Sequence, residues 1–335
     1  MRAAILASLV ALVSACGASS AASDPPHVSS GSAANGAGAG SPARAKNSGK
    51  KAGSNGVASP ATVPATTTTT LPRPAPGWTV VSETPAGIVT DTRTVHLPDG
   101  TSVTLVRFHA GRFRLDLHLG SVDPPSAGLV IPAAAGYAIS QAERPLLLGA
   151  FNGGFQVSTG SGGVEVDGQV AVPLVAGDAS LVINQNGSVR VGVWGQTVPV
   201  PGEKVLSVRQ NLTPLISAGQ VSPQIANVGA WGAELYGVAA TARSAVGTDP
   251  AGNLVYAASM GALPSDLVAA LQMAGVTNAM ELDINPYWVQ ADVASTPGGT
   301  LSAAIPGQQR PADTYLLGWT RDFFAVLAAT PKATP

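Results

Sequence analysis

The stretch of sequence with the most candidate catalytic groups lies near the C-terminal end and reads NAMELDINPYW, residues 278–288. Three polar residues in it, Glu281, Asp283 and Asn285, alternate with apolar residues. On a β-strand a period of two puts the polar side chains on one face, with the Cα atoms of the two acidic residues roughly 6.5–7 Å apart. Two carboxyl groups on one face can divide the roles of acid and base, because repulsion between like charges raises the pKa of one. A strand with one solvated face has the same alternation, so both interpretations stay open.

Two other stretches carry groups suited to ligand binding. The sequence GAFNGGF, residues 149–155, places Asn152, Gly153 and Gly154 directly after an apolar strand. Paired glycines permit positive φ and a close approach of the backbone to a ligand, although a tight turn has the same composition. Arg243 begins an otherwise apolar strand, where its guanidinium is suited to a phosphate or a carboxylate. An ordinary strand-end arginine in water is the alternative.

The elements that must position these residues are predicted from hydrophobic periodicity and turn residues. We expect hairpins that join strands 103–108 and 112–119, 180–184 and 188–194, and 244–248 and 254–259; further strands at 146–151, 164–170 and 279–285; and helices at 131–143 and 264–274. The alternation in 112–119 places His118 on a polar face. Because strands and hairpins dominate, we predict an α+β fold, with a mostly antiparallel mixed sheet and a few helices in one compact domain at 78–330.

The composition and the missing motifs exclude several classes of protein. The 335 residues include 18 Lys and Arg and 19 Asp and Glu, a net charge of −1, so no nucleic-acid partner is predicted. The sequence has no G-x-S-x-G, H-E-x-x-H or Walker motif, and its one cysteine, Cys16, rules out an intrachain disulfide. We predict no metal site and no cofactor. A hard cation such as Ca²⁺ on the oxygen atoms of Glu281, Asp283 and Asn285 stays an open alternative, although Ca²⁺ takes six to eight ligands.

The N-terminal part of the chain is typical of an exported protein. Residues 1–15 combine a positive start with a short apolar run, too short for a permanent membrane span, and predict a signal peptide. Residues 13–16, VSAC, resemble the lipobox of bacterial lipoproteins, which implies a lipid on Cys16 and an anchor at the outer face of the membrane; secretion after an ordinary signal is the alternative. Residues 16–77, rich in Ala, Gly, Ser, Pro and Thr, predict a disordered tether.

Three motifs, in the same order along the chain, resemble those of the phosphodiester glycosidase family. They are NGGF at 152–155, RSAVG at 243–247 with a D-x-x-G turn at 249–252, and Leu282-Asp283 after a helix and a strand. The resemblance covers roughly residues 100–325. It implies an exported hydrolase that cleaves a sugar-1-phosphodiester in envelope glycans or glycolipids, so that its ligand is a carbohydrate or a glycosyl phosphate.

The resemblance also implies roles for individual residues. Asp283, which lies in a family motif, is predicted as the principal catalytic or sugar-binding carboxylate. Glu281 is predicted as its catalytic partner from strand geometry alone. Glycosidases place two carboxyl groups about 5–5.5 Å apart for retention and about 6.5–9.5 Å apart for inversion, and the strand spacing fits either range. Arg243 is predicted to hold the phosphate. Asn152, with its two glycines, is predicted to bind a sugar hydroxyl or a phosphate oxygen.

The loop after Asp283 departs from the family pattern. Where the family continues L-D-G-G, this chain continues Ile284-Asn285-Pro286-Tyr287-Trp288. Asn285 and Tyr287 are predicted to contact substrate, Tyr287 by stacking on a sugar face, and Trp288 either stacks likewise or covers the core. A protein that binds a glycan or phosphopolymer without cleaving it is therefore the alternative function.

Overall fold

The computed structural model describes residues 75–232 and 238–329. The predicted signal peptide, Cys16 and the tether up to residue 74 lie outside these ranges. The described residues belong to one unit, Thr67–Pro335. Within the described ranges, no helix has the length and apolar character needed to cross a membrane.

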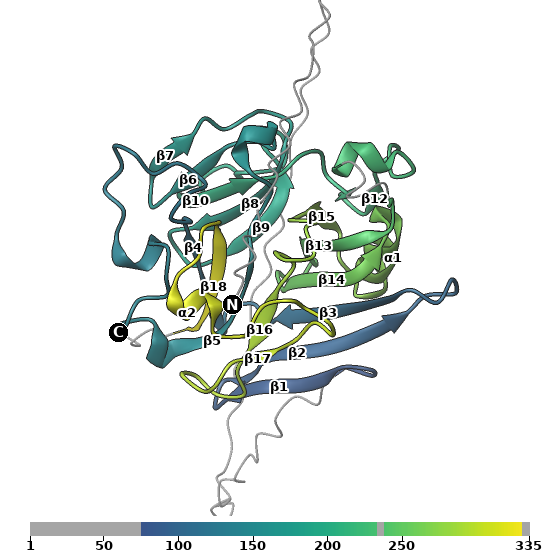
Figure 1. Ribbon diagram of the computed structural model, residues 1–335, viewed down its shortest axis with the longest axis horizontal. Helices are drawn as coiled ribbons and strands as arrows, with labels where there is room; N and C mark the ends of the chain where they lie inside the picture. The colour runs from purple at the N-terminus through teal and green to yellow at the C-terminus, as the bar shows by residue number, and fades with distance from the viewer. Residues whose placement is uncertain (1–74, 233–237, 330–335) are drawn as a thin grey trace, which may run out of the picture. The chain divides into compact units, whose positions relative to one another are not determined.

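Eighteen strands of the described part form three sheets, and the paired strands run antiparallel (Figure 1). The first sheet contains, in spatial order, β1 (Thr79–Thr84), β2 (Gly87–His96), β3 (Ser102–Phe108), β14 (Leu254–Ala262), β13 (Thr241–Thr248), β15 (Asn278–Glu281), β11 (Ile216–Ser217) and β12 (Gln220–Val221). The second contains β7 (Gln169–Val172), β6 (Val164–Val166), β10 (Val205–Gln210), β8 (Ala179–Asn184) and β9 (Val189–Val193). The third contains β17 (Ser302–Ala303), β16 (Ala291–Val293), β5 (Leu147–Asn152), β18 (Phe323–Ala328) and β4 (Phe113–His118). The antiparallel expectation is confirmed.

Helices are few, so the fold is richer in β-structure than the α+β prediction. The described part has α1 (Pro264–Met273), the short α2 (Thr314–Leu317) and four single 3₁₀ turns (Ala133–Ala135, Arg144–Leu146, Val157–Thr159 and Val228–Trp231). The predicted helix at 264–274 is confirmed as α1. Proline stands at its first position, where no intrahelical N–H is needed, and the Asp266 carboxylate accepts a 2.8 Å hydrogen bond from the Leu263 N–H. Helix α1 packs its apolar side on β14, β13 and β3.

Two of the predicted hairpins are confirmed. Strands β8 and β9 pair across the NQNG turn, in which Gly187 has a φ of 85° that suits glycine. Strands β13 and β14 pair along almost their whole length. The predicted strand at 164–170 is instead two strands, β6 and β7, which pair across a turn at Asp167 and Gly168.

The predicted hairpin of 103–108 and 112–119 is wrong, because its two strands belong to different sheets. Strand β3 pairs with β2 and β14, whereas β4 pairs with β18. The HAG segment therefore carries the chain from the first sheet to the third. Local sequence cannot distinguish this crossing from a hairpin, since β14, which pairs with β3, and β18, which pairs with β4, are far away along the chain.

Two other local predictions also fail. The Ala-rich segment 131–143 is mostly irregular, with one 3₁₀ turn at Ala133–Ala135. His118 is fully buried rather than on a solvated face: one ring nitrogen lies 2.7 Å from the Gly136 carbonyl and the other 3.1 Å from the Glu143 carboxylate. Strand β4 has buried positions on both faces at this end because the segment after it folds back over His118.

The sheets share one apolar core. Phe151 of β5 lies with its ring centroid 6.1 Å from Phe108 of β3, 5.2 Å from Tyr256 of β14 and 5.1 Å from Phe324 of β18. Apolar residues of β8 and β9 in the second sheet belong to the same cluster. This packing places the C-terminal ends of β5 and β15 beside the N-terminal end of β18.

Candidate functional site

A cavity of about 460 Å³ lies at the point where the chain leaves β5 and β15. Its walls are formed by Phe155, Gln156, Thr159, Leu212, Gly229, Gly232, Asp283, Ile284, Asn285 and Trp288. Asp283 is the only ionisable residue among them. Two hollows are larger: one of about 760 Å³ next to the β8–β9 turn has no carboxylate among its described lining residues, and one of about 520 Å³ has the exposed Asp99 in its lining and no buried acidic group there. The smaller cavity is therefore the candidate site, because apolar walls around one acidic group are typical of small-ligand sites.

Backbone hydrogen bonds fix the position of Asp283. Strand β15 ends at Glu281, so the predicted strand 279–285 is too long, and the backbone of Asp283 joins two sheets instead. Its N–H donates to the Gly153 carbonyl over 3.1 Å, and its own carbonyl accepts from both the N–H and the hydroxyl of Ser244. The Asp283 side chain therefore lines the cavity, and its backbone is fixed by hydrogen bonds to Gly153 and to Ser244.

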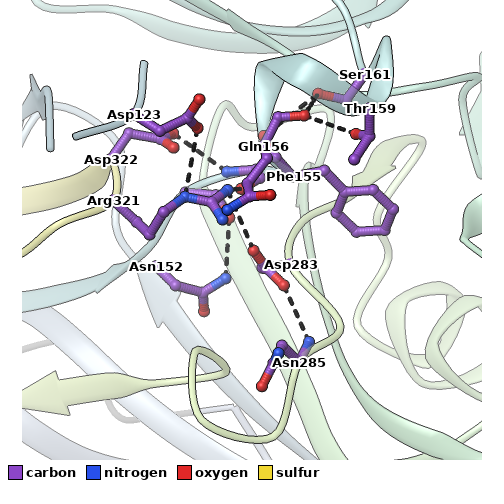
Figure 2. Close-up of polar contacts among 12 residues, drawn as sticks. Asp123, Asn152, Phe155, Gln156, Thr159, Ser161, Asp283, Asn285, Arg321 and Asp322 are labelled. Atoms are coloured by element: carbon purple, nitrogen blue, oxygen red, sulfur yellow. Dashed lines mark hydrogen bonds and ion pairs between the residues drawn. The ribbon is translucent and has the colours of Figure 1, made fainter. Parts of the chain in front are cut away.

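The environment of the Asp283 carboxyl group raises its pKa to about 7. Burial is the largest cause, since the residue is 5 % exposed. The Asn285 N–H, 2.9 Å from Oδ1, and the Arg321 guanidinium, with Nη2 3.5 Å from Oδ2, lower the pKa in part (Figure 2). A carboxyl group with this pKa can gain or lose a proton near neutral pH, as acid–base chemistry requires.

Glu281, predicted as the second catalytic carboxyl, lies away from the cavity. Its side chain is fully buried and its Oε1 is 2.7 Å from Arg243 Nη1; burial raises the carboxyl pKa, and the Arg243 guanidinium lowers it in part. The Arg243 guanidinium, also fully buried, donates further hydrogen bonds to the carbonyls of Ala262, Trp231 and Ala239. Each of its nitrogens has a partner, so the predicted phosphate-binding group has no exposed atom. Glu281 and Arg243, both predicted as site residues, therefore form an ion pair inside the first sheet.

The paired glycines allow other atoms to approach the backbone closely, but the atoms that do so belong to the protein itself. Neither Gly153 nor Gly154 has a positive φ. A Cβ atom on Gly153 would overlap the Asp322 carboxylate and lie 2.8 Å from the Asp322 carbonyl, and one on Gly154 would lie 2.8 Å from Arg209 Cζ. Asp322 and Arg209 form a fully buried ion pair over 2.8 Å. The glycines therefore make room for the buried ion pair of Arg209 and Asp322.

Asn152 belongs to the same buried layer. Its amide nitrogen donates to the Ser244 hydroxyl over 2.9 Å, and its amide oxygen accepts from the Tyr256 hydroxyl over 2.7 Å and the Gln290 N–H over 3.2 Å. The residue is 3 % exposed and does not line the cavity. Its position supports the strand ends that carry Asp283.

The loop after Asp283 forms the opposite wall. Asn285 lines the cavity with its side chain turned back to accept the Tyr287 N–H over 2.9 Å. Tyr287 is 55 % exposed and lies outside the lining, whereas Trp288 is half-buried and lines the cavity. The aromatic part of the cavity wall is therefore formed by Trp288 and Phe155, which come from different segments of the chain.

Sequence reasoning missed Arg321, which contacts both Asp283 and Trp288. Its Nε lies 3.4 Å from the Asp123 carboxylate (Figure 2). Its Nη2 donates to the Gly154 carbonyl over 3.0 Å, and its Cζ is 4.5 Å from the centre of the Trp288 ring. The signal that could have shown it is the pair Arg321-Asp322 directly before the apolar strand β18, in a chain with few charges. In the described ranges no cluster of three or more His, Cys, Asp or Glu side chains is arranged to hold a metal ion.

Comparisons with known proteins give little sequence similarity. No protein-family model matches the chain, and no curated protein matches it. Similar solved structures include the catalytic domain of zebrafish N-acetylglucosamine-1-phosphodiester alpha-N-acetylglucosaminidase, auto-inhibited by its pro-peptide, with 15% identity, a TM-score of 0.47, and coverage of 75% of this chain and 88% of that one. A hypothetical protein from Synechocystis has 14% identity and a TM-score of 0.44, over 72% of this chain and 62% of that one. Likenesses of this degree carry no conclusion about activity or site residues.

Proposed function

We propose that this protein is an exported hydrolase that cleaves the glycosidic bond of a sugar-1-phosphodiester, in which Asp283 is the catalytic carboxyl. The observation that supports it best is the position of Asp283 in the wall of the cavity, which the aromatic side chains of Phe155 and Trp288 also line. Apolar and aromatic surfaces suit the face of a sugar ring, and a carboxyl group beside them suits its anomeric carbon. The motif resemblance of residues 152–155 and 243–247 suggests the same reaction.

One carboxyl group in the cavity wall is enough for this reaction. A phosphodiester leaves as a weak base, so its oxygen needs little protonation. Ionised Asp283 takes a proton from water as the water oxygen bonds to the anomeric carbon, while the bond from that carbon to the phosphate oxygen breaks. The products are the free sugar and a phosphomonoester, and the proton passes from Asp283 to solvent. Glu281, held by Arg243, positions the end of β15 rather than touching substrate.

The envelope is the proposed place of action. The signal sequence and the lipobox at 13–16 support a lipid anchor on Cys16, and the tether up to residue 77 supports reach from the membrane to its glycans or glycolipids. No cofactor is proposed.

The test is a panel of sugar-1-phosphodiesters incubated with the full chain, with free sugar as the readout. We expect turnover by the wild type and its loss in Asp283→Asn. Asp178→Asn is the control, because burial also raises the pKa of Asp178, yet this residue lies outside the cavity lining. An Asp283→Asn variant that cleaves as fast as the wild type would contradict the mechanism.

A glycan-binding protein without hydrolytic activity is the second candidate. The burial of Glu281 favours it, because the described residues of the cavity lining include one carboxyl group, whereas most glycosidases use two. In that case the wild type and Asp283→Asn both bind glycosyl phosphates, and neither releases sugar.

A further inference from the structure

The described part of the chain contains three buried arginines, Arg209, Arg243 and Arg321, and they differ in how well their donors are used. Every nitrogen of Arg209 and of Arg243 donates a hydrogen bond. Arg321 is 4 % exposed, yet within the described residues its Nε and Nη1 have no hydrogen-bond acceptor. Buried donors without a partner are rare in folded proteins, so each one needs an explanation.

Two carboxylates lie near Arg321 but neither satisfies it. Asp123 is 3.4 Å from Nε and Asp283 is 3.5 Å from Nη2, and neither contact has hydrogen-bond geometry. Charge-assisted hydrogen bonds between nitrogen and oxygen are normally about 2.7–2.9 Å long. The Oδ2 atom of Asp123 is itself buried without a hydrogen-bond donor in the described part of the chain. The two carboxylates therefore balance the positive charge of Arg321 without accepting hydrogen bonds from it, and within the described residues its Nε–H and Nη1–H groups have no acceptor.

The Arg321 guanidinium, with these unpaired donors, lies directly behind the cavity wall. Arg321 contacts two residues that line the cavity, Asp283 and Trp288, and the carbonyl of Gly154, which precedes the lining residues Phe155 and Gln156. Figure 2 shows the guanidinium between the carboxylates of Asp123 and Asp283. Because the contact of Nη2 with Asp283 is long, rotation of that one side chain would open Nη2 to a ligand in the cavity.

We propose that Arg321 is the anion-recognition residue of the cavity, and that a phosphate oxygen of the ligand takes the place of Asp283 at its guanidinium. The planar fork of an arginine matches two oxygens of a phosphate, and stacking on Trp288 holds the fork in plane. The exchange releases the Asp283 carboxylate from its cation next to the bound ligand. The identity of the ligand as a phosphodiester rests on the proposed function.

The fold favours Arg321 over the other two buried arginines for this role. Arg243 would have to give up Glu281 inside the sheet, and Arg209 would have to give up Asp322, each at a hydrogen-bonded distance of 2.8 Å or less. Leaving a buried charge without its partner is strongly unfavourable. Arg321 can take an anion without breaking a hydrogen bond to a carboxylate.

The test measures anion binding without turnover. The full chain is titrated with dimethyl phosphate, which has the charge of a phosphodiester but no glycosidic bond, by calorimetry. We expect Arg321→Gln to weaken binding tenfold or more, since a hydrogen bond to a charged group is lost, and Arg321→Lys to weaken it less. Arg114→Gln, at a surface arginine paired with Asp116, is the control and should bind as the wild type does. In parallel, the Nε–H signals of the arginines are followed by NMR in the labelled wild type, with Arg321 assigned from the lysine variant.

Each outcome decides the proposal. Equal affinity in the wild type and Arg321→Gln overturns it, as does a wild type that binds no dimethyl phosphate in the millimolar range. If Arg321→Gln does not fold, the wild-type NMR titration decides, because the Arg321 signal must move with dimethyl phosphate. Binding that depends on Arg321 in a protein that cleaves no sugar phosphodiester supports this inference and removes the proposed function.

Discussion

Gly153→Ala tests whether the paired glycines serve the fold or a ligand. The added methyl group would overlap the Asp322 carboxylate and lie 2.8 Å from the Asp322 carbonyl, so it cannot be accommodated without moving β18 or breaking the buried ion pair of Asp322 with Arg209. Overpacking alone costs about 1–3 kcal/mol, and breaking a buried ion pair costs about 3–5 kcal/mol. We expect the free energy of unfolding to fall by about 3–5 kcal/mol, a large part of the 5–15 kcal/mol typical of folded domains.

Urea denaturation of the full chain, followed by circular dichroism, measures this change. Gly261→Ala in β14 is the matched control, because a Cβ atom there meets no other atom within 4 Å and Gly261 has no positive φ. The control should change stability by less than about 1 kcal/mol. If Gly153→Ala unfolds at the same urea concentration as the wild type but loses affinity for ligands, Gly153 serves ligand approach and the reasoning from the Asp322 contact is wrong.

Four further predictions concern buried charges. Arg243→Met should lower the free energy of unfolding by about 3–5 kcal/mol because Glu281 is left buried without its cation, and Arg243→Met combined with Glu281→Leu should restore much of the loss in the same urea assay. Burial raises the pKa of Asp283 from 3.8 to about 7, so between these pH values the folded protein binds a proton that the unfolded chain has lost. The free energy of unfolding should therefore fall by up to roughly 4 kcal/mol as pH rises from 3.8 to about 7. Asp283→Asn should remove that part of the pH dependence of thermal unfolding. If Asp283 is a general base, kcat/KM of the wild type should rise as pH rises through about 7. His118→Leu should destabilise the protein at neutral pH, where Glu143 is left charged and buried, and the difference from the wild type should shrink in acid as Glu143 gains a proton; an equal difference at both pH values would contradict the paired arrangement.

Local patterns in the sequence were sufficient for many of the elements. The Asn-Gly turn defines the β8–β9 hairpin, and Pro264 with Gly275 delimits α1, because turn and cap preferences depend on a few adjacent residues. The same patterns misplaced segment 112–119, whose strand pairs with β18 near the other end of the chain. Its pairing depends on contacts between distant residues, which periodicity does not encode.

The sequence by itself singled out the stretch 278–288, and Asp283 in it lines the cavity. The motif resemblance ranked Asp283 before Glu281, but strand parity placed both carboxyl groups on the same face and so predicted both in the site. Only the tertiary structure separated them in space, by burying Arg243 against Glu281 and leaving Asp283 at the cavity beyond the strand end. Arg321 lies beside Asp283 because β18 is inserted between β5 and β4. The sequence determines the chemical types of the site residues. Tertiary packing determines which charged groups pair with one another and how far each is exposed to solvent.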